Sequence, residues 1–237
     1  MEWIASPEAW IALFTLTVLE IVLGIDNIIF ISILVDRLPE HQQKKARLTG
    51  LALAMVLRIL LLLSISWVMG LTKDLFDVAG HGFSGRDLIL LFGGLFLIWK
   101  STQEIHHSLS GNKEEEQSTT VATYGSVLAQ IAVLDLVFSL DSVITAVGMA
   151  KHVPVMVIAI VIAVGVMMLA AEAIGEFVEN NPTIKMLALS FLILVGTALL
   201  GEGMGLHIPK GYIYFAMAFA VVVELLNLKM RKNHSTL

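Results

Sequence analysis

Two short apolar stretches, 18-VLEIVLGIDNIIFIS-32 and 133-VLDLVFSLDSVITAV-147, carry acidic side chains where a membrane-spanning helix normally holds none. Each stretch has two carboxylates six residues apart, and a neutral oxygen-bearing side chain follows the second one. A carboxylate at the centre of a membrane helix costs about 2.5–3.5 kcal/mol on insertion scales. These carboxylates must therefore be protonated, paired or bound to a cation. The candidate ligands are Glu20, Asp26, Asn27, Asp135, Asp141 and Ser142.

The balance of charge in these stretches favours a bound cation over a purely structural ion-pair network. Arg58 is the only arginine expected inside a span, and we expect it to balance one of the four carboxylates at most. The alternative is that the acids form an ion-pair network that serves only to hold helices together. The surplus of acids over bases points to a cation site.

The ligand types select the kind of ion. The chain has no cysteine, and its seven histidines fall in loops or at the ends of the apolar runs. Soft ions such as copper(I), and zinc in its usual nitrogen or sulfur sites, are therefore disfavoured. Oxygen ligands favour Mn²⁺, Mg²⁺ or Ca²⁺, and ligand type alone does not rank these three.

Three further acids lie in later apolar runs or at their ends. They are either secondary ligands in a vestibule or gate, or interface residues that pair with a basic side chain. The acids are Glu172, Glu202 and Glu224, and the basic candidates are Lys185, Lys210 and Arg58.

The elements that position these residues are predicted to be transmembrane helices. The chain has 237 residues, of which 57% are hydrophobic and 15% charged, a composition typical of membrane proteins. A helix needs about 20 apolar residues to cross the hydrocarbon core. The sequence predicts an all-α membrane protein with seven transmembrane helices, over residues 9–34, 48–70, 87–104, 122–149, 154–175, 185–203 and 211–228.

Lysine and arginine predict the orientation of these spans in the bilayer. The loops after the first, third and fifth spans, together with the C-terminal tail, hold ten of these residues, against four on the other side. Because cytoplasmic loops carry the excess of positive charge, the N-terminus is predicted outside and the C-terminus in the cytoplasm. No basic patch suggests a nucleic-acid partner.

The two acidic stretches also indicate an internal repeat, because their polar positions match at a constant offset of 115 residues. A tandem copy of three spans lies inverted in the membrane, and such proteins bind substrate at the repeat interface. Small residues at the matching positions Gly24 and Ser139 would let the first and fourth spans cross closely. The predicted parts are a first repeat (1–109), a cytoplasmic linker (110–120), a second repeat (121–204), and a seventh helix with its tail (205–237).

Longer stretches around these residues resemble the TerC family of integral membrane proteins. They are LEIVLGIDNIIFIS, DLVFSLDSVITAVGM, GGLFLIWKSTQEIHH and GEGMGLHIPKGYIYFAMAFAVVVELLNL, and the resemblance spans the whole chain. It implies a seven-helix protein of the bacterial inner membrane, related to the LysE superfamily of exporters and concerned with metal homeostasis. Several relatives are associated with manganese export, and the founding members with tellurium resistance.

The resemblance also implies which acids are central. By motif position, the family's intramembrane acidic pair falls on Asp26 and Asp141, supported by Glu20 and Asp135. The second motif continues with Ile-Thr-Ala at 144–146, where TerC proper has Pro-Ala-Ile. This variant resembles the branch whose larger members carry cytoplasmic CBS-type domains.

We therefore expect an exporter of a hard divalent cation, with Mn²⁺ first, rather than an enzyme, and no resident cofactor. Two neighbouring carboxylates do not easily both stay ionised when empty, so exchange of metal for protons is a natural coupling. A second expectation is a membrane partner that binds metal or helps to assemble other proteins without transporting anything.

Two other functions fit the sequence less well. Export of a small organic cation or amino acid is disfavoured, because the acidic site is expected to lack aromatic lining. An intramembrane aspartyl protease could use Asp26 and Asp141 as a dyad. The chain lacks the Pro-Ala-Leu motif of such enzymes, and a protease has little use for Glu20 and Asp135.

Overall fold

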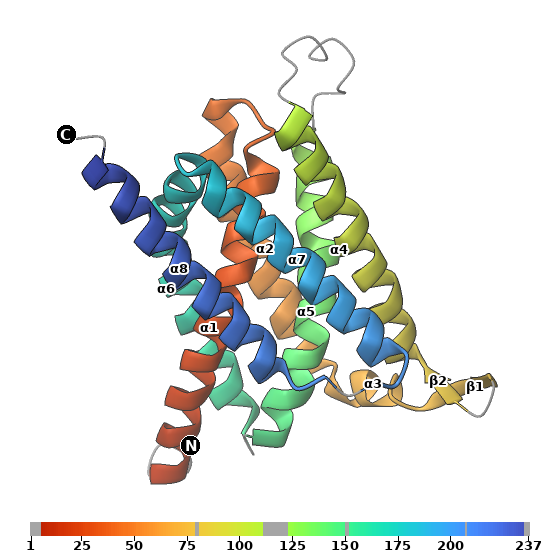
Figure 1. The fold of residues 1–237 in the computed structure, drawn as a ribbon. Helices are drawn as coiled ribbons and strands as arrows, with labels where there is room; N and C mark the ends of the chain where they lie inside the picture. Colours follow the sequence, from red (N-terminus) through yellow and green to blue (C-terminus); the bar gives the residue numbers. More distant parts are fainter. Residues whose placement is uncertain (1–5, 79–80, 111–122, 150–151, 207, 235–237) are drawn as a thin grey trace.

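The computed structural model describes residues 6–78, 81–110, 123–149, 152–206 and 208–234. Within these ranges the chain forms a bundle of long helices with one small hairpin (Figure 1). The helices are α1 (Pro7–Val35), α2 (Glu40–Leu63), α3 (Ile65–Gly70), α4 (Gly85–Ser110), α5 (Tyr124–Met149), α6 (Val153–Glu179), α7 (Pro182–Gly203) and α8 (Lys210–His234), and the strands are β1 (Asp74–Val78) and β2 (His81–Ser84). The start of α1 and the end of α8 lie at opposite ends of the bundle (Figure 1).

Local sequence signals set several helix boundaries. Helices α1, α6 and α7 each begin with a proline in the first two positions, where the missing N–H would have no intrahelical partner. Helix α7 ends at a glycine cap. Gly205 has φ 82°, and the Leu206 N–H donates to the Gly201 carbonyl at 2.9 Å. This is a Schellman motif, and it turns the chain sharply before α8.

The helices agree in part with the seven predicted spans. Among the described residues, α1, α2, α4, α6, α7 and residues Gly211–Met230 of α8 are long and apolar enough to cross a bilayer. The fourth predicted span, 122–149, corresponds to α5, whose described apolar part, Tyr124–Leu140, is shorter. An all-α membrane protein with six candidate spans is therefore supported, and the count of seven stays a prediction.

The sequence misjudged two details near the second span. Helix α2 begins at Glu40, about two turns before the predicted 48, because its first turns are polar and carry no hydropathy signal. The helix then breaks at Ser64, whose hydroxyl donates to the Leu60 carbonyl at 2.8 Å, and α3 continues the path. The predicted loop after this span contains the antiparallel hairpin β1–β2.

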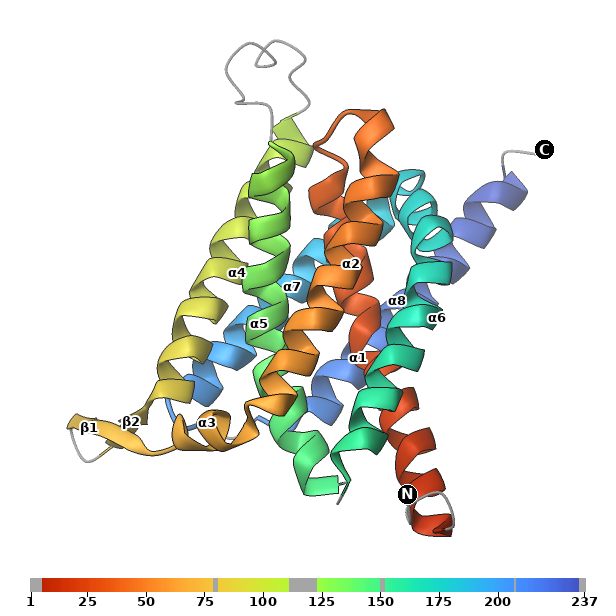
Figure 2. The same cartoon turned by 180° about the vertical axis from the view of Figure 1, so that it is seen from behind.

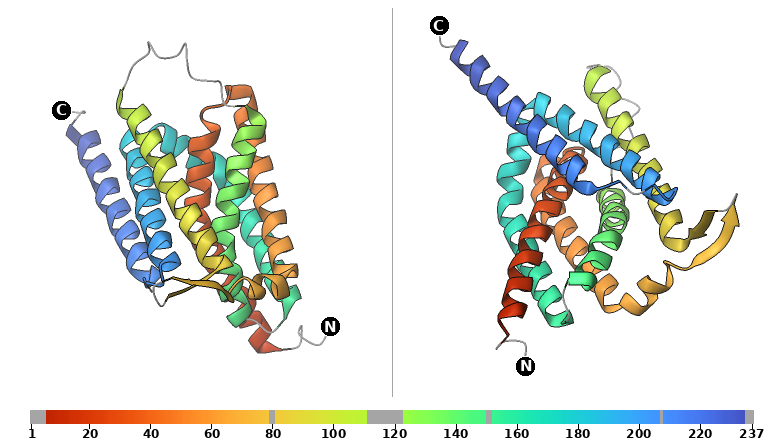
Figure 3. Two further views of the ribbon diagram at one scale, coloured as in Figure 1. Left: turned by 90° about the vertical axis from the view of Figure 1, so that its right-hand side faces the viewer. Right: turned by 60° about the horizontal axis from the view of Figure 1, so that its bottom comes forward.

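The helices pack in three principal pairs. Helix α1 packs along α6, α2 along α5, and α4 along α7; α2, α5 and α6 stand side by side in Figure 2. Helix α8 packs mainly on α7 and lies at the outer edge of the bundle (Figure 3). Only 6% of its apolar window is buried. The buried centre is thus formed by α1, α2 and α4–α7.

The contact between α4 and α7 depends on two glycines. A Cβ added to Gly94 would lie 2.6 Å from the Gly196 carbonyl oxygen, and one added to Gly196 would lie 2.9 Å from the Gly94 carbonyl oxygen. The two backbones therefore touch, as in other membrane helix pairs with small residues at the interface.

We predict that Gly196→Val destabilises the protein by at least 1–3 kcal/mol, roughly the cost of overpacking a close contact. The measurement is thermal unfolding of the purified protein in detergent. Gly165→Val is the matched control, because nothing lies within 4 Å of a Cβ at Gly165. Equal unfolding temperatures for the two variants would contradict the proposed role of the glycine contact.

Candidate functional site

A buried ion-pair network lies at the centre of the bundle. The Arg58 guanidinium pairs with Glu20 through Nη1, and with Asp135 through Nη2 at 2.9 Å from Oδ1. Its Nε donates to the Ser139 hydroxyl at 3.0 Å, and that hydroxyl donates to Asp135 Oδ2 at 3.0 Å. All four side chains are at most 4% exposed. The network thus satisfies each charged group with a partner.

Three helices supply this network. Glu20 comes from α1, Arg58 from the second half of α2, and Asp135 from α5. Ser139 is one turn beyond Asp135 on the same face of α5, so both can face Arg58. The sequence predicted only a packing role for Ser139, and its hydroxyl is the hydrogen-bonding element that this prediction missed.

Arg58 was expected to balance one carboxylate at most. It contacts two carboxylates. Its single positive charge still leaves a formal charge of −1 when Glu20 and Asp135 are both ionised. The network therefore holds both acids in place without neutralising them fully.

The expected crossing of the first and fourth spans at Gly24 and Ser139 is wrong. A Cβ at Gly24 would overlap the Met167 sulfur, so Gly24 accommodates α6 rather than α5. Ser139 instead faces Arg58 of α2. The small residues predicted the close packing correctly but not its partner, because spacing along a chain does not say which helix lies opposite.

Asn27 and Ser142 lie next to the network. The Asn27 amide is 3.5 Å from Asp135 Oδ1, and the Ser142 hydroxyl donates to the Ser139 carbonyl at 3.2 Å. Of the six predicted ligands, the structure therefore brings together Glu20, Asp135, Asn27 and Ser142. The side chains of Asp26 and Asp141 lie outside the described part of the structure.

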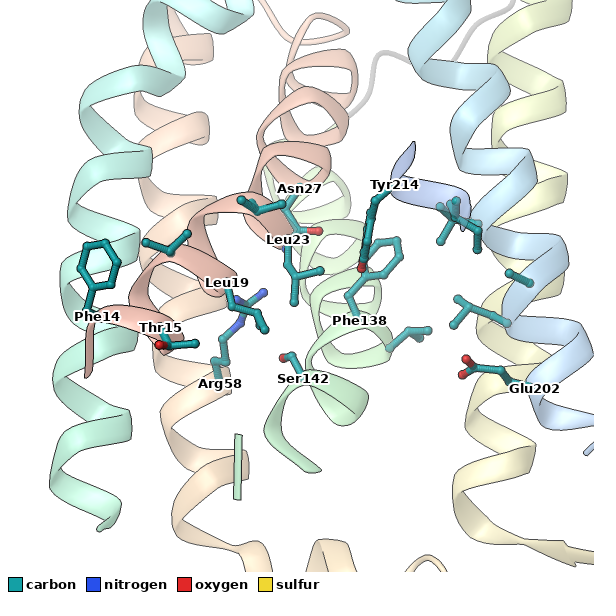
Figure 4. A pocket seen from close by; sticks show the side chains of 17 residues that line it. Phe14, Thr15, Leu19, Leu23, Asn27, Arg58, Phe138, Ser142, Glu202 and Tyr214 are labelled. Carbon is teal, nitrogen blue, oxygen red and sulfur yellow. The ribbon is translucent and has the colours of Figure 1, made fainter. Parts of the chain in front are cut away.

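A cavity of about 610 Å³ opens beside the network. Figure 4 shows Asn27, Arg58 and Ser142 around it, with Glu202 of α7 on the far side. Apolar side chains from α1, α5, α7 and α8 form most of the wall, together with the aromatic rings of Phe14, Phe138 and Tyr214. The expectation of a site without aromatic lining is therefore wrong for this cavity.

The three secondary acids occupy different places. Glu202 lines the cavity, and its carboxylate is 3.7 Å from Arg86. Glu172 is exposed and pairs with Lys44 at 2.9 Å, and Glu224 accepts a hydrogen bond from Asn227 on its own helix at 3.3 Å. Neither Glu172 nor Glu224 lines the cavity. Arg86 of α4 and Lys44 of α2 were not among the expected partners.

Within the described residues, no group of three or more histidine, aspartate or glutamate side chains is arranged to hold a metal ion. Glu20 and Asp135 are paired with Arg58, and the side chains of Asp26 and Asp141 lie outside the described part of the structure.

Comparison with known proteins agrees with this membrane architecture. A family model described as "Integral membrane protein TerC family" matches residues 5–236. The chain belongs to the TerC family. This TerC protein is 63% identical to a "UPF0053 protein" of Haemophilus influenzae and 58% identical to the "UPF0053 inner membrane protein YgdQ" of Escherichia coli K12, each over 98% of both chains. It is 51% identical to "UPF0053 inner membrane protein YoaE", of which it covers 45%. No solved structure matches the chain.

We predict that Arg58→Ala destabilises this TerC protein by about 3–5 kcal/mol, because it leaves two buried carboxylates without their partner. Thermal unfolding in detergent measures the effect. Combining Arg58→Met with Glu20→Gln and Asp135→Asn should recover most of the loss, since a neutral network needs no counter-charge. If Arg58→Ala unfolds at the wild-type temperature, the network does not stabilise the bundle.

Proposed function

We propose that this protein is a membrane transporter that exports a hard divalent metal ion, with Mn²⁺ as the assigned substrate. The observation that carries the proposal is the excess of buried acid around Arg58. One guanidinium faces Glu20 of α1 and Asp135 of α5 at the centre of the bundle. The same two helices, α1 and α5, also carry Asp26 and Asp141. A cation on this site would compensate the remaining negative charge.

Helical spacing supports a role for Asp26 and Asp141 at the cavity. Residues at i, i+4 and i+7 share one face of a helix, so Asp26 is on the stripe of Leu19 and Leu23 in α1. Asp141 is one turn beyond Val137 in α5, and these three apolar residues line the cavity. We infer that the two aspartates are the central ligands, with Asn27 and Ser142 beside them and Glu20 and Asp135 adding negative charge behind them.

Oxygen ligands favour Mn²⁺, Mg²⁺ and Ca²⁺ over softer ions. Among these we assign Mn²⁺ on the resemblance to the manganese-exporting members of the family. Glu202 on the far wall of the cavity is the secondary ligand that we retain, because it faces the same space. We assign no enzymatic activity, since the acids have a sufficient role in binding a cation.

Outward movement of a divalent ion needs an energy source. Moving charge +2 against 100 mV costs about 4.6 kcal/mol. Protons that replace the metal on paired carboxylates supply a coupling. The excess of lysine and arginine in the loops after the first, third and fifth predicted spans and in the C-terminal tail favours a cytoplasmic C-terminus and an N-terminus outside.

The packing pattern supports two inverted three-helix repeats and a seventh helix, α8. In the proposed repeats, α1 of the first corresponds to α5 of the second, and α2 corresponds to α6. The α1–α6 contact therefore corresponds to the α5–α2 contact, and both are principal helix pairs. The α4–α7 pair maps onto itself, with Gly94 and Gly196 in reciprocal contact. Rocking of one repeat against the other would give alternating access to the cavity.

One observation favours a second function, a membrane protein that binds metal or assists another protein without transporting ions. Arg58 donates to three acceptors, and all of them are buried. Such a satisfied network is also what a purely structural device would have.

The first experiment is Mn²⁺ uptake into proteoliposomes under an imposed pH gradient, read by quenching of an interior dye. We expect Asp26→Asn and Asp141→Asn each to reduce the initial rate at least about tenfold, because each removes a charged ligand. Mg²⁺ and Ca²⁺ serve as competitors. Glu172→Gln is the matched control, since this exposed acid pairs with Lys44 away from the cavity.

If both aspartate variants took up Mn²⁺ at the wild-type rate, the ion path would lie elsewhere. Absence of flux in a folded, inserted wild-type protein would favour the non-transporting function. If Mg²⁺ or Ca²⁺ inhibits Mn²⁺ uptake at concentrations below the KM for Mn²⁺, that ion would replace Mn²⁺ as the proposed substrate.

A further inference from the structure

The large cavity occupies one half of the bundle. Its lining residues come from the first three-quarters of α1, the last third of α2, the second halves of α5 and α7, and the start of α8. These segments surround the end of the bundle where α1 begins and α7 finishes (Figure 1). The opposite end, where α1 and α6 finish and α2 and α7 begin, is the end that we propose to face the cytoplasm.

The bundle is closely packed at that opposite end. Residues 30–35 of α1 are all buried, whereas Phe14, Val18 and Val22 nearer its start are 72%, 43% and 49% exposed. The cavity beside the buried segment has a volume of about 10 Å³, enough for one water molecule, against about 610 Å³ for the large cavity. Within the described residues, this packed layer separates the proposed cytoplasmic end from the large cavity.

Two acids and two bases lie beside the small cavity of this layer. Asp36, directly after α1, pairs with Lys185 of α7 at 2.6 Å. Arg47 of α2 lies against Gly175 of α6 and shares the small cavity with Glu179 at the end of α6. Helices α1 and α2 belong to the first proposed repeat, and α6 and α7 to the second. Each repeat thus supplies one acid and one base, and the four charges balance when the repeats are together.

Other polar contacts at this end differ in the parts that they join. Lys44 of α2 pairs with Glu172 of α6 at 2.9 Å, which is a second ion pair between the proposed repeats. Arg37 pairs with Glu104 of α4 at 2.6 Å, so this ion pair lies within the first repeat. Only the former kind of contact resists separation of the two repeats.

We propose that the two acids and two bases beside the small cavity form a lock between the two repeats at the cytoplasmic end. The lock consists of Asp36, Arg47, Glu179 and Lys185. It must separate before an ion can reach the large cavity from that side. Its role in transport rests on the proposed function, whereas the lock itself depends only on the contact between the repeats.

The burial of the lock suits a contact that opens and closes. The side chains of Lys185 and Asp36 are 25% and 27% exposed, so separation returns them to water at low cost. The Arg58 network is different, because its carboxylates and guanidinium are at most 4% exposed and their separation would strand buried charges. The repeats can therefore part at the lock while the central network stays paired.

The test makes use of a chain without cysteine. Ser32→Cys places a single thiol in the packed layer, where the serine is 5% exposed and lines the small cavity. The measurement is the rate at which this thiol reacts with a hydrophilic maleimide in the purified full chain in detergent. Because the thiol reacts when the end opens, its rate follows the population of the open conformation. We expect Lys185→Gln to raise the rate at least about threefold, since Asp36 loses its partner across the repeats.

Arg37→Gln is the matched control. It breaks an ion pair of the same length at the same end, but within the first repeat, and should leave the rate unchanged. Asp36→Lys combined with Lys185→Asp should return the rate to its original value, because the pair is restored with its charges exchanged. Recovery by this exchange also shows that Lys185→Gln acts through the ion pair and not through loss of the fold.

Equal rates in the Lys185→Gln and Arg37→Gln backgrounds would overturn the proposal, as would an exchanged pair that leaves the rate high. The labelling rate needs no transported ion and is independent of the Mn²⁺ flux measurement. A rate that depends on Lys185 in a protein without flux would support the lock and reject the transport function. Flux together with a rate that does not depend on Lys185 would reject the lock alone.

Discussion

The cost of placing charge in a low-dielectric interior governs this structure. Arg58 can lie at the centre of the bundle only because Glu20 and Asp135 flank it, and each acid depends equally on the arginine. The requirement fixes the relative positions of α1, α2 and α5, since the three charges must meet. Hydrophobic packing alone would leave such helices free to rotate or slide, because lipid is as apolar as their side chains.

The same constraint explains the character of the cavity. Its walls are mostly apolar because the surrounding faces belong to membrane helices, and its polar groups lie beside the charge network and, with Glu202, on the opposite side. The Glu202 carboxylate faces the cavity from the side opposite Asn27, Arg58 and Ser142 (Figure 4).

The sequence predicted the membrane class, the approximate ends of most helices and the presence of Glu20 and Asp135 inside the bundle. These features depend on local hydropathy and on the rarity of charge in apolar runs. It did not predict that Arg58 joins both acids, that Gly24 faces Met167, or that Arg86 approaches Glu202. These contacts depend on which helices are neighbours, and helical periodicity gives a face but not the helix opposite it.

The contact between Gly94 and Gly196 has a mechanical consequence. The backbones of α4 and α7 also approach each other at Gly203, where an added Cβ would lie 2.8 Å from the Asp87 carbonyl oxygen. Neither helix can therefore slide along the other without forcing side chains into a carbonyl group, and the two contacts would hold the pair in one axial register.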